Sequence, residues 1–403
     1  MSKLYPEQEE VAQEAEVLLR NYGMVYIAAE PRFGKSYITA SLITTNSLIL
    51  TVKSALAGWE ETCRYFDIEP VLINYESLHK VDYEKFDYIV IDEAPKISSF
   101  PKKNKARKEI DRFIHKDIKV VFLSGTPNIE SQAQLFHQLS ISPNHSFSKY
   151  YEKGNSTAFS HWYFGGDNFV SRDDNLKGYG NRTKKIVGYN KEAWNHADVS
   201  VPKSKYEPIM IKRFHTDENM SSKVVLRPIK APKSVEEVYH TLKTNKCFMG
   251  LNGIGEIEPI GKAQLLIKLH QIAQGNYIST DGTTVHISSF KARVCFEEHP
   301  DAIVFYKYQA DLSLLRIAGY TAEQLKQVDS SIMGIDFSNY EEAIIYSLTW
   351  SGQNYVQCLS RLNNVNKNIK PTFYVYITKG TVDEKIFKAV SNKRDFNTQF
   401  IRS

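Results

Sequence analysis

Short apolar runs that end in polar loops recur along the first third of the chain. Three such runs, each with the loop that follows it, are Val25–Ala28 with Ala29–Ser36, Phe86–Ile91 with Asp92-Glu93, and Lys119–Leu123 with Ser124–Pro127. Continuous apolar runs of about four to eight residues are typical of strands buried on both faces of a parallel sheet. Ligands bind at the carboxyl ends of such strands. We therefore expect an α/β fold in which the three loops form one site.

The loop after the first run has the residues of a phosphate-binding loop. Backbone N–H groups of the loop and of the following helix would point at the phosphates, Lys35 would supply a positive charge, and the Ser36 hydroxyl would bind Mg²⁺. The tripeptide Gly34-Lys35-Ser36 is short, however, and Ala29 stands where the usual pattern has its first glycine. An ordinary turn between a strand and a helix is the alternative interpretation of this loop alone.

The two later loops complete the predicted site. Asp92 is placed to hold Mg²⁺, directly or through water, and Glu93 to act as general base toward the attacking water. The small residues of Ser124–Thr126 suit a loop that lies beside the γ-phosphate and rearranges when that group leaves. An acidic turn and a plain turn would explain each loop separately, but not the order of all three along the chain.

The order of G-K-S, D-E-A-P and S-G-T-P resembles that of superfamily-two helicases, and the details resemble their Swi/Snf-type branch of DNA translocases. The resemblance covers nearly the whole chain. It implies an α/β helicase core of two RecA-like parallel-sheet lobes, with an aromatic and basic insertion between them. It also implies ATP and Mg²⁺ as cofactors and DNA as partner, and the late motifs resemble those of phage-encoded members.

The resemblance gives expected roles to individual residues. Those expected to bind the nucleotide are Gln8, Arg32, Phe33, Gly34, Lys35, Ser36, Gly334 and Asp336, with Ser36 and Asp92 on the metal ion. Those expected to act in catalysis are Lys35, Asp92, Glu93, Gln357 and Arg361. Those expected to contact nucleic acid in the first lobe are Lys53, Ser54, Trp59 and Thr126.

Two positions depart from the family pattern. In the segment that resembles Q-x-x-x-R-x-x-R, Gln357 and Arg361 fit, but Asn364 replaces the second arginine. An arginine that reaches the γ-phosphate contributes about 10³-fold or more to hydrolysis, so the change matters. Arg361 alone, the nearby Lys367 or a partner protein would then have to supply that charge, or hydrolysis is slow. Arg32 occupies a position that is usually glycine, where it would either crowd or contact the nucleotide.

We expect the first lobe to span residues 1–145, an insertion and linker 146–231, and the second lobe 232–403. The insertion is rich in aromatic and basic residues. Its aromatic side chains either stack on bases or pack the insertion onto its lobe, and we favour packing for Trp162 and Phe164. In the stacking interpretation Arg182, Lys184 and Lys185 follow the phosphates of the nucleic acid.

Composition adds little to this assignment. The 403 residues carry a formal net charge of +5, so nucleic-acid binding must come from local patches such as Pro101–Lys108, for which a solvated helix face is an equal alternative. The four cysteines are isolated from one another, which argues against a zinc knuckle or a disulfide framework. No apolar stretch suggests a membrane span or a signal core, so we expect a cytoplasmic monomer, in a host cell if the protein is phage-encoded.

A second insertion candidate is the segment 275–287, where Asp281-Gly282 between alternating residues predicts a β-hairpin. Such a hairpin is either a strand-separating pin or structural decoration. The expected function is ATP-dependent translocation on duplex, forked or branched DNA, in replication, recombination or repair. An RNA helicase and a non-catalytic nucleic-acid-binding scaffold remain the alternatives.

Overall fold

The protein is described by a computed structural model that covers residues 3–82, 85–98, 103–127, 134–141, 203, 206–214, 222–250, 255–328, 337, 339–362 and 371–402. The chain divides into two compact units, Met1–His215 with Phe396–Ser403, and Thr216–Asp395. We describe each unit by itself. Among the described helices, none has the length and apolar composition needed to cross a membrane.

A six-stranded sheet forms the centre of the first unit, in the order β3-β2-β4-β5-β1-β6. Every neighbouring pair of strands in it is parallel. The strands are β1 (Met24–Ala29), β2 (Ser47–Thr51), β3 (Val71–Asn74), β4 (Tyr88–Asp92), β5 (Lys119–Ser124) and β6 (Met210–Arg213). The three apolar runs with polar loops are therefore the three adjacent strands β4, β5 and β1.

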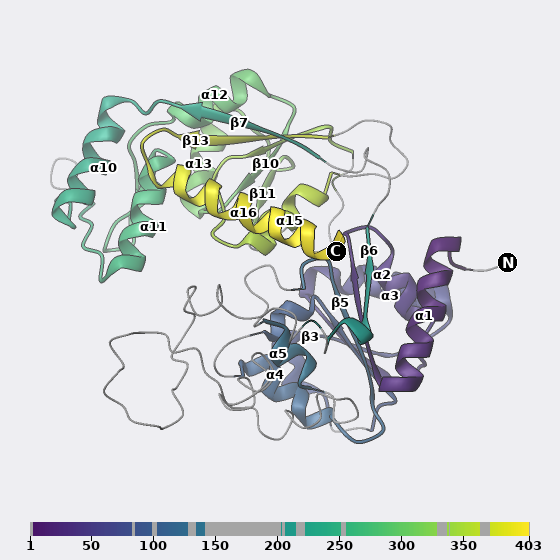
Figure 1. Ribbon diagram of the computed structural model, residues 1–403. Coiled ribbons are helices and arrows are strands. Elements are labelled where there is room, and N and C mark those ends of the chain that lie inside the picture. Colours follow the sequence, from purple (N-terminus) through teal and green to yellow (C-terminus); the bar gives the residue numbers. More distant parts are fainter. Residues whose placement is uncertain are drawn as a thin grey trace, which may run out of the picture. The chain divides into compact units, whose positions relative to one another are not determined.

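Helices cover both faces of this sheet, because side chains along a buried strand alternate between the faces. Val25 and Ile27 of β1 pack with one group of helices, whereas Tyr26 and Ala28 pack on the opposite face. The first group is α1 (Pro6–Tyr22), α2 (Lys35–Ala40) and α3 (Leu56–Phe66), and the second is α4 (Lys105–Ile110) and α5 (Gln134–Leu139) (Figure 1). Short 3-10 helices complete the unit: η1 (Lys53–Ala55), η2 (Tyr75–Lys80), η3 (Ala94–Ile97), η4 (Asp111–Phe113) and η6 (Glu207–Ile209).

The second unit contains a five-stranded sheet in the order β11-β10-β12-β13-β7, again with every neighbouring pair parallel. The strands are β7 (Lys223–Ile229), β10 (Ile303–Tyr306), β11 (Leu325–Gln327), β12 (Glu342–Ile345) and β13 (Thr372–Thr378). The expected α/β fold with two parallel-sheet, RecA-like lobes is thus confirmed. The sequence placed β6 and β7 in the connecting region, but in the structure β6 pairs with β1 and β7 pairs with β13. The remainder of the insertion, residues 146–202, lies outside the described residues.

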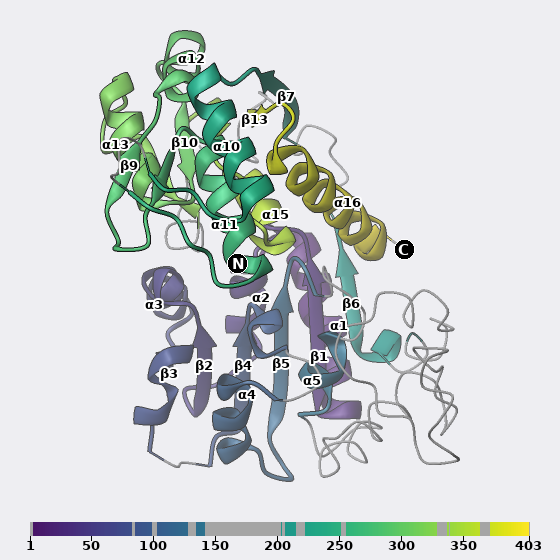
Figure 2. The ribbon, with the colours of Figure 1, turned by 90° about the vertical axis from the view of Figure 1, so that its left-hand side faces the viewer.

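Two groups of helices cover the second sheet (Figure 2). One face packs against α10 (Lys233–Asn245), α11 (Lys262–Ala273), α15 (Gly352–Ser360) and α16 (Val382–Arg402), and the other against α12 (Phe290–Glu298) and α13 (Gln309–Ala318). The predicted hairpin is confirmed as the antiparallel pair β8 (Asn276–Ile278) and β9 (Thr284–His286). Gly282 has a φ of 89° in its turn, a conformation that favours glycine.

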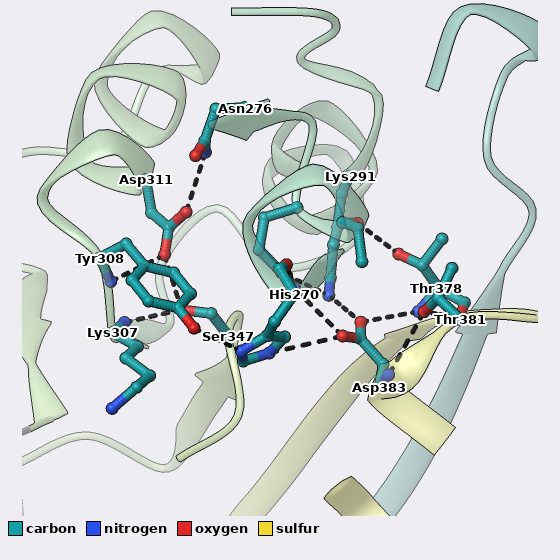
Figure 3. A network of polar contacts seen from close by, with 12 residues as sticks. His270, Asn276, Lys291, Lys307, Tyr308, Asp311, Ser347, Thr378, Thr381 and Asp383 are labelled. Atoms are coloured by element: carbon teal, nitrogen blue, oxygen red, sulfur yellow. Dashed lines mark hydrogen bonds and ion pairs between the residues drawn. The ribbon is translucent and has the colours of Figure 1, made fainter. Parts of the chain in front are cut away.

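A buried polar network joins the start of α16 to α11 and α12 (Figure 3). Asp383 Oδ2 accepts hydrogen bonds from Lys291 Nζ at 3.2 Å and from the Thr378 N–H at 3.0 Å. Gln274 Nε2 donates to Asp383 Oδ1 at 3.1 Å, and its Oε1 accepts from Lys291 Nζ at 2.6 Å. Because Lys291 and Asp383 are fully buried, each charge needs the other and the surrounding amides. The network therefore fixes the first turn of α16 on its sheet.

A second group of contacts ties the loops after β10 and β12 to this network. Asp311 Oδ2 accepts from the Ser347 hydroxyl at 2.7 Å and from the Tyr308 N–H at 3.0 Å. His270 Nδ1 lies 2.7 Å from the Tyr308 hydroxyl, and its Nε2 lies 3.4 Å from Asp383 Oδ1. Burial lowers the pKa of His270 to about 4, against the attraction of Asp383, so the imidazole is neutral near pH 7. A neutral histidine thus lies between the start of α16 and the loop after β10, and it bonds to that loop through Tyr308.

The low pKa of His270 predicts a pH-dependent stability. The unfolded histidine, with a pKa near 6.5, binds a proton that the folded one, with a pKa of about 4, rejects. The free energy of unfolding should therefore fall by up to about 3 kcal/mol as the pH is lowered from 6.5 to 4. Urea unfolding at several pH values should show this slope in the wild type and a shallower one in His270→Gln.

Subtracting the two pH profiles separates His270 from Asp311, whose pKa is raised by burial and whose effect has the opposite sign. The exposed His240 provides the matched control, because His240→Asn should keep the wild-type slope. Equal slopes in the wild type and His270→Gln would contradict this explanation.

Candidate nucleotide-binding site

The register of the first sheet brings the three polar loops together. Ala28 of β1 lies opposite Ser124 of β5, and Asp92 of β4 lies opposite Leu123 of β5. The three strands therefore end at the same level, at the carboxyl edge of the sheet. A Cβ on Gly125 would lie 3.2 Å from Pro31 Cδ and 3.4 Å from the Ala29 carbonyl oxygen. The loop after β5 is thus in contact with the candidate phosphate loop.

The phosphate loop connects β1 to α2 and ends at Gly34, whose φ is 91°. Lys35 is the first residue of α2, and its ammonium group donates to the Ala29 carbonyl at 2.8 Å and to the Glu30 carbonyl at 3.1 Å. Its charge is therefore held within the loop itself. Ser36 follows in the first turn and is partly exposed, as a residue that reaches a metal ion or a phosphate must be.

Gln8 lies directly against this loop. Its Nε2 donates to the Phe33 carbonyl at 3.1 Å, and its Oε1 accepts from the Tyr5 N–H at 3.2 Å. Proline at the first helical position begins α1 just after Tyr5, which fixes the direction from which Gln8 approaches. The structure thus joins Gln8 to the phosphate loop, although the two are distant in sequence. Its contact with adenine stays a prediction.

Two residues of the site have a left-handed backbone conformation, which residues other than glycine rarely adopt. Arg32 has a φ of 69° and Glu93 a φ of 53°. Elsewhere among the described residues, non-glycine residues with positive φ are Asp67 and Lys246, which end helices α3 and α10 in the usual left-handed cap. Arg32 and Glu93 have no such explanation. Unfavourable backbone conformations of this kind concentrate at functional sites.

Asp92 is held by donors from three segments. Its Oδ2 accepts from the Thr51 hydroxyl at 2.7 Å and from the Trp59 indole N–H at 2.9 Å, and its Oδ1 accepts from the Glu93 N–H at 3.0 Å. A carboxylate that accepts several hydrogen bonds is fixed in orientation. Thr51 was not identified from the sequence. Its position, as a polar residue at the end of the apolar strand β2, could have indicated a role in the site.

Two buried tyrosines lie on the face of the sheet opposite Trp59. The Tyr75 hydroxyl donates to the Asp92 carbonyl oxygen, and the Tyr26 hydroxyl donates to Gln138 Oε1 at 2.7 Å. Burial, reinforced by the charge of Glu93, raises the pKa of both phenols well above the usual value. Both therefore keep their protons and act as donors. The sequence did not predict a role for either hydroxyl group, because both tyrosines occupy core positions where an apolar side chain would pack equally well.

The predicted nucleic-acid contacts of the first lobe differ in their exposure. Lys53 is exposed and Ser54 partly exposed on η1, just after β2, so both stay predictions. Trp59 is 2% exposed and donates to Asp92, and Thr126 is 1% exposed. Their side chains are buried here, unlike those of Lys53 and Ser54, and a contact of either with nucleic acid stays a prediction. Trp59 orients Asp92.

Two predicted catalytic residues lie on the second unit. Gln357 and Arg361 are one turn apart at the end of α15 and therefore on the same side of that helix. Gln357 is 3% exposed, and within the described part of the chain neither polar atom of its amide has a hydrogen-bond partner. Gly334, Asp336, Arg182, Lys184, Lys185 and Asn364 lie outside the described residues. The roles of all these residues stay predictions.

The residues of the first unit fit a magnesium ion bound with the nucleotide. Mg²⁺ is usually held by one or two carboxylates together with phosphate oxygens and waters. Asp92 is one such carboxylate, and its Oδ1 accepts one hydrogen bond whereas Oδ2 accepts two, which leaves room at Oδ1 for a further contact. In the described part of the chain no group of three or more His, Cys, Asp or Glu residues is suited to hold a metal alone. A metal here would depend on the phosphates.

The contact between Trp59 and Asp92 predicts an energetic coupling. Trp59→Phe keeps an aromatic ring in the core but leaves the carboxylate short of a donor, which should lower the free energy of unfolding by about 1–3 kcal/mol. In a double-mutant cycle with Asp92→Asn, measured by urea unfolding, the two effects should be strongly non-additive. Additive effects would mean that the indole contributes by packing alone.

The position of Gln8 on Gly34 predicts a second coupling. A Cβ on Gly34 would lie 2.2 Å from Gln8 Nε2, and the φ of 91° disfavours any other residue. Gly34→Ala should therefore destabilise the protein by about 1–2 kcal/mol from the backbone alone, and more when Gln8 is displaced. In the double variant Gly34→Ala with Gln8→Ala, thermal unfolding should show only the destabilisation that comes from the backbone. If the second substitution relieves nothing, Gln8 does not constrain the loop.

Comparison with protein-family models finds no matching family, and comparison with curated proteins finds no match. Among solved structures, the chain is similar to the SWI2/SNF2 ATPase core of Sulfolobus solfataricus in complex with double-stranded DNA. The identity is 16%, the match covers 99% of this chain and 93% of that one, and the TM-score is 0.41. It is also similar to the SWI2/SNF2 ATPase core domain of the same organism, with 15% identity, 98% and 89% coverage and a TM-score of 0.40. The proposal for the function therefore rests on the motifs and on the geometry of the first unit.

Proposed function

We propose that the protein is an ATP-dependent DNA translocase of the helicase type. The observation that carries the proposal is the convergence of three loops at the carboxyl edge of β4, β5 and β1, with Asp92 held by three donors beside Glu93. An ordinary set of turns does not need an oriented carboxylate, a lysine at the start of a helix and two strained backbones in the same place. Hydrolysis of a nucleoside triphosphate needs groups that are positioned in this way.

In this proposal the phosphates of ATP bind the loop Ala29–Gly34 and the start of α2. Lys35 exchanges its hydrogen bonds with the Ala29 and Glu30 carbonyls for the phosphate oxygens, which are stronger acceptors because they are charged. Gln8 holds the loop at Phe33 and is proposed to contact the base of the nucleotide. Arg32 adds a second cation to the same loop.

Glu93 acts as the general base. Its left-handed backbone follows Asp92 directly, so the two carboxylates leave the strand in different directions. Asp92 is fixed by Thr51 and Trp59, whereas Glu93 takes the proton of the attacking water. Mg²⁺, when bound by Ser36 and Asp92, would neutralise phosphate charge. Arg361 is proposed to stabilise the charge that develops on the γ-phosphate.

The nucleic acid is proposed to contact the loop after β2. Lys53 and Ser54 belong to it, and β2 is the neighbour of β4 in the sheet, so this loop leaves the same edge as the Asp92 segment. A contact there with the DNA backbone is sensitive to movements of Asp92, because Thr51 at the end of β2 donates to its carboxylate. Duplex, forked or branched DNA is the proposed substrate, with remodelling of forks or junctions as the output.

The test is steady-state ATP hydrolysis by the purified chain with no polymer, single-stranded DNA, duplex DNA, a forked junction or RNA. Duplex or forked DNA should stimulate turnover most strongly. Lys35→Ala and Glu93→Gln should reduce the stimulated rate by at least about 100-fold, because the first removes the phosphate cation and the second the base. Chelation of divalent cations should have a similar effect.

Two exposed residues provide matched controls: Lys96→Ala and Glu76→Gln should keep the wild-type rate. Stimulation by RNA at least equal to that by DNA would favour an RNA helicase. Nucleic-acid binding that is independent of nucleotide, without turnover in any condition, would instead favour a non-catalytic scaffold and would contradict the proposal.

A further inference from the structure

One buried glutamine contacts all three segments that carry the candidate motifs. Gln138 lies on α5 and is 0% exposed. Its Oε1 accepts from the Tyr26 hydroxyl at 2.7 Å, and its Nε2 donates to the Ser98 hydroxyl oxygen at 2.6 Å and to the Pro127 carbonyl at 3.0 Å. Ser98 and Tyr26, which are 40 and 112 positions from Gln138 in the sequence, thus both bond to its amide.

Each partner of Gln138 belongs to a different part of the site. Tyr26 is in β1, which leads into the phosphate loop. Ser98 ends the 3-10 helix η3, which directly follows Asp92 and Glu93. Pro127 ends the segment Ser124–Pro127 that follows β5. The amide therefore connects the three segments from the side of the sheet that α4 and α5 cover.

The loop Ser124–Pro127 is held at its end by this amide, because the Pro127 carbonyl accepts from Gln138 directly. Within the loop, Ser124 Oγ accepts from the Thr126 N–H at 2.9 Å. A Cβ on Gly125 would lie 3.2 Å from Pro31 Cδ and 3.4 Å from the Ala29 carbonyl oxygen, so the loop packs against the phosphate loop. A shift of the phosphate loop would therefore move a segment that is anchored to Gln138.

Only an amide satisfies these partners together. The Tyr26 hydroxyl needs an acceptor, and the Pro127 carbonyl needs a donor, because both groups are buried away from water. Glutamate would supply the acceptor without the donors and would add a buried negative charge. An apolar side chain of the same shape would remove the acceptor of the buried Tyr26 hydroxyl and the donor to the buried Pro127 carbonyl, which is unfavourable. The chemistry of the site thus specifies glutamine.

We propose that Gln138 is a positioning residue that couples the loop Ser124–Pro127 to the phosphate loop and to the Asp92-Glu93 segment, so that the site distinguishes ATP from ADP. The inference rests on the proposed function. Gln138 touches no substrate itself. Its role is to convert contact of the γ-phosphate with one loop into a fixed position of the other two.

The experiment compares Gln138→Met, Gln138→Glu and Tyr26→Phe with the wild type in the full chain. Binding of ADP and of a non-hydrolysable ATP analogue is measured by titration calorimetry, and kcat and KM by steady-state hydrolysis with duplex DNA. The ratio of the two affinities should fall toward one. kcat should fall by about 10- to 100-fold with a much smaller change in KM, because positioning rather than binding is lost.

Leu139→Ala is the matched control for stability. Leu139 is the neighbour of Gln138 on α5 and is 0% exposed, so its truncation loosens the same helix without removing a hydrogen bond. It should lower Tm while keeping the affinity ratio and kcat. Tyr26→Phe retains the stacking on Phe122, at 5.5 Å between ring centroids, and keeps the test valid if the Gln138 variants do not fold.

The outcomes separate the two proposals. Wild-type discrimination and turnover in both Gln138 variants and in Tyr26→Phe, with loss of turnover in Lys35→Ala, would overturn the role of Gln138 and leave the ATPase standing. Losses in Leu139→Ala equal to those in Gln138→Met would also overturn it, since stability alone would explain them. A wild-type chain that neither binds nor hydrolyses ATP would overturn the proposed function, and the role of Gln138 with it.

Discussion

Parallel pairing in the register Ala28–Ser124 and Asp92–Leu123 is the constraint on which the first unit depends. With this register the three strands end at the same level, so the loops that follow them lie next to one another. A slip of one residue in either pairing would turn Asp92 or Ser124 to the opposite face, because side chains alternate along a strand. Burial of both faces opposes such a slip, since every apolar side chain of the strand would change its neighbours. The site is thus a consequence of how the core packs.

The two units meet the same physical problem, which is how to keep polar groups in an apolar interior. In the first unit the acidic pair is supported by Thr51, Trp59 and Tyr75, which donate from separate elements. In the second unit Lys291 and Asp383 share Gln274. Leaving a buried polar group without its partner costs more free energy than one hydrogen bond contributes to stability. Each network therefore either forms completely or destabilises its unit. Both networks also hold loops at the carboxyl edge of a sheet.

The sequence predicts those features whose signal is local. The runs that become β1, β4 and β5 are mainly apolar, with Asp87 and Lys119 near the starts of the latter two, and the Asp281-Gly282 turn specifies its hairpin. Trp59 illustrates the limit, because the resemblance assigned it to nucleic acid, whereas its side chain lies with Cys63 on the buried face of α3. Gln138 and Tyr26 carry no local signal at all. Their partners are distant in sequence, and only the folded sheet shows why a polar atom is required at each position.

The left-handed backbones of Arg32 and Glu93 have a consequence for the entropy of ligand binding. A glycine in either position would let the loop sample many conformations, and a ligand would have to select one of them. With arginine and glutamate, few conformations are accessible, and the chain adopts an unfavourable one when it folds. The ordering of both loops is thus completed during folding, before any ligand arrives. The interaction energy of a bound phosphate is then left for affinity and chemistry.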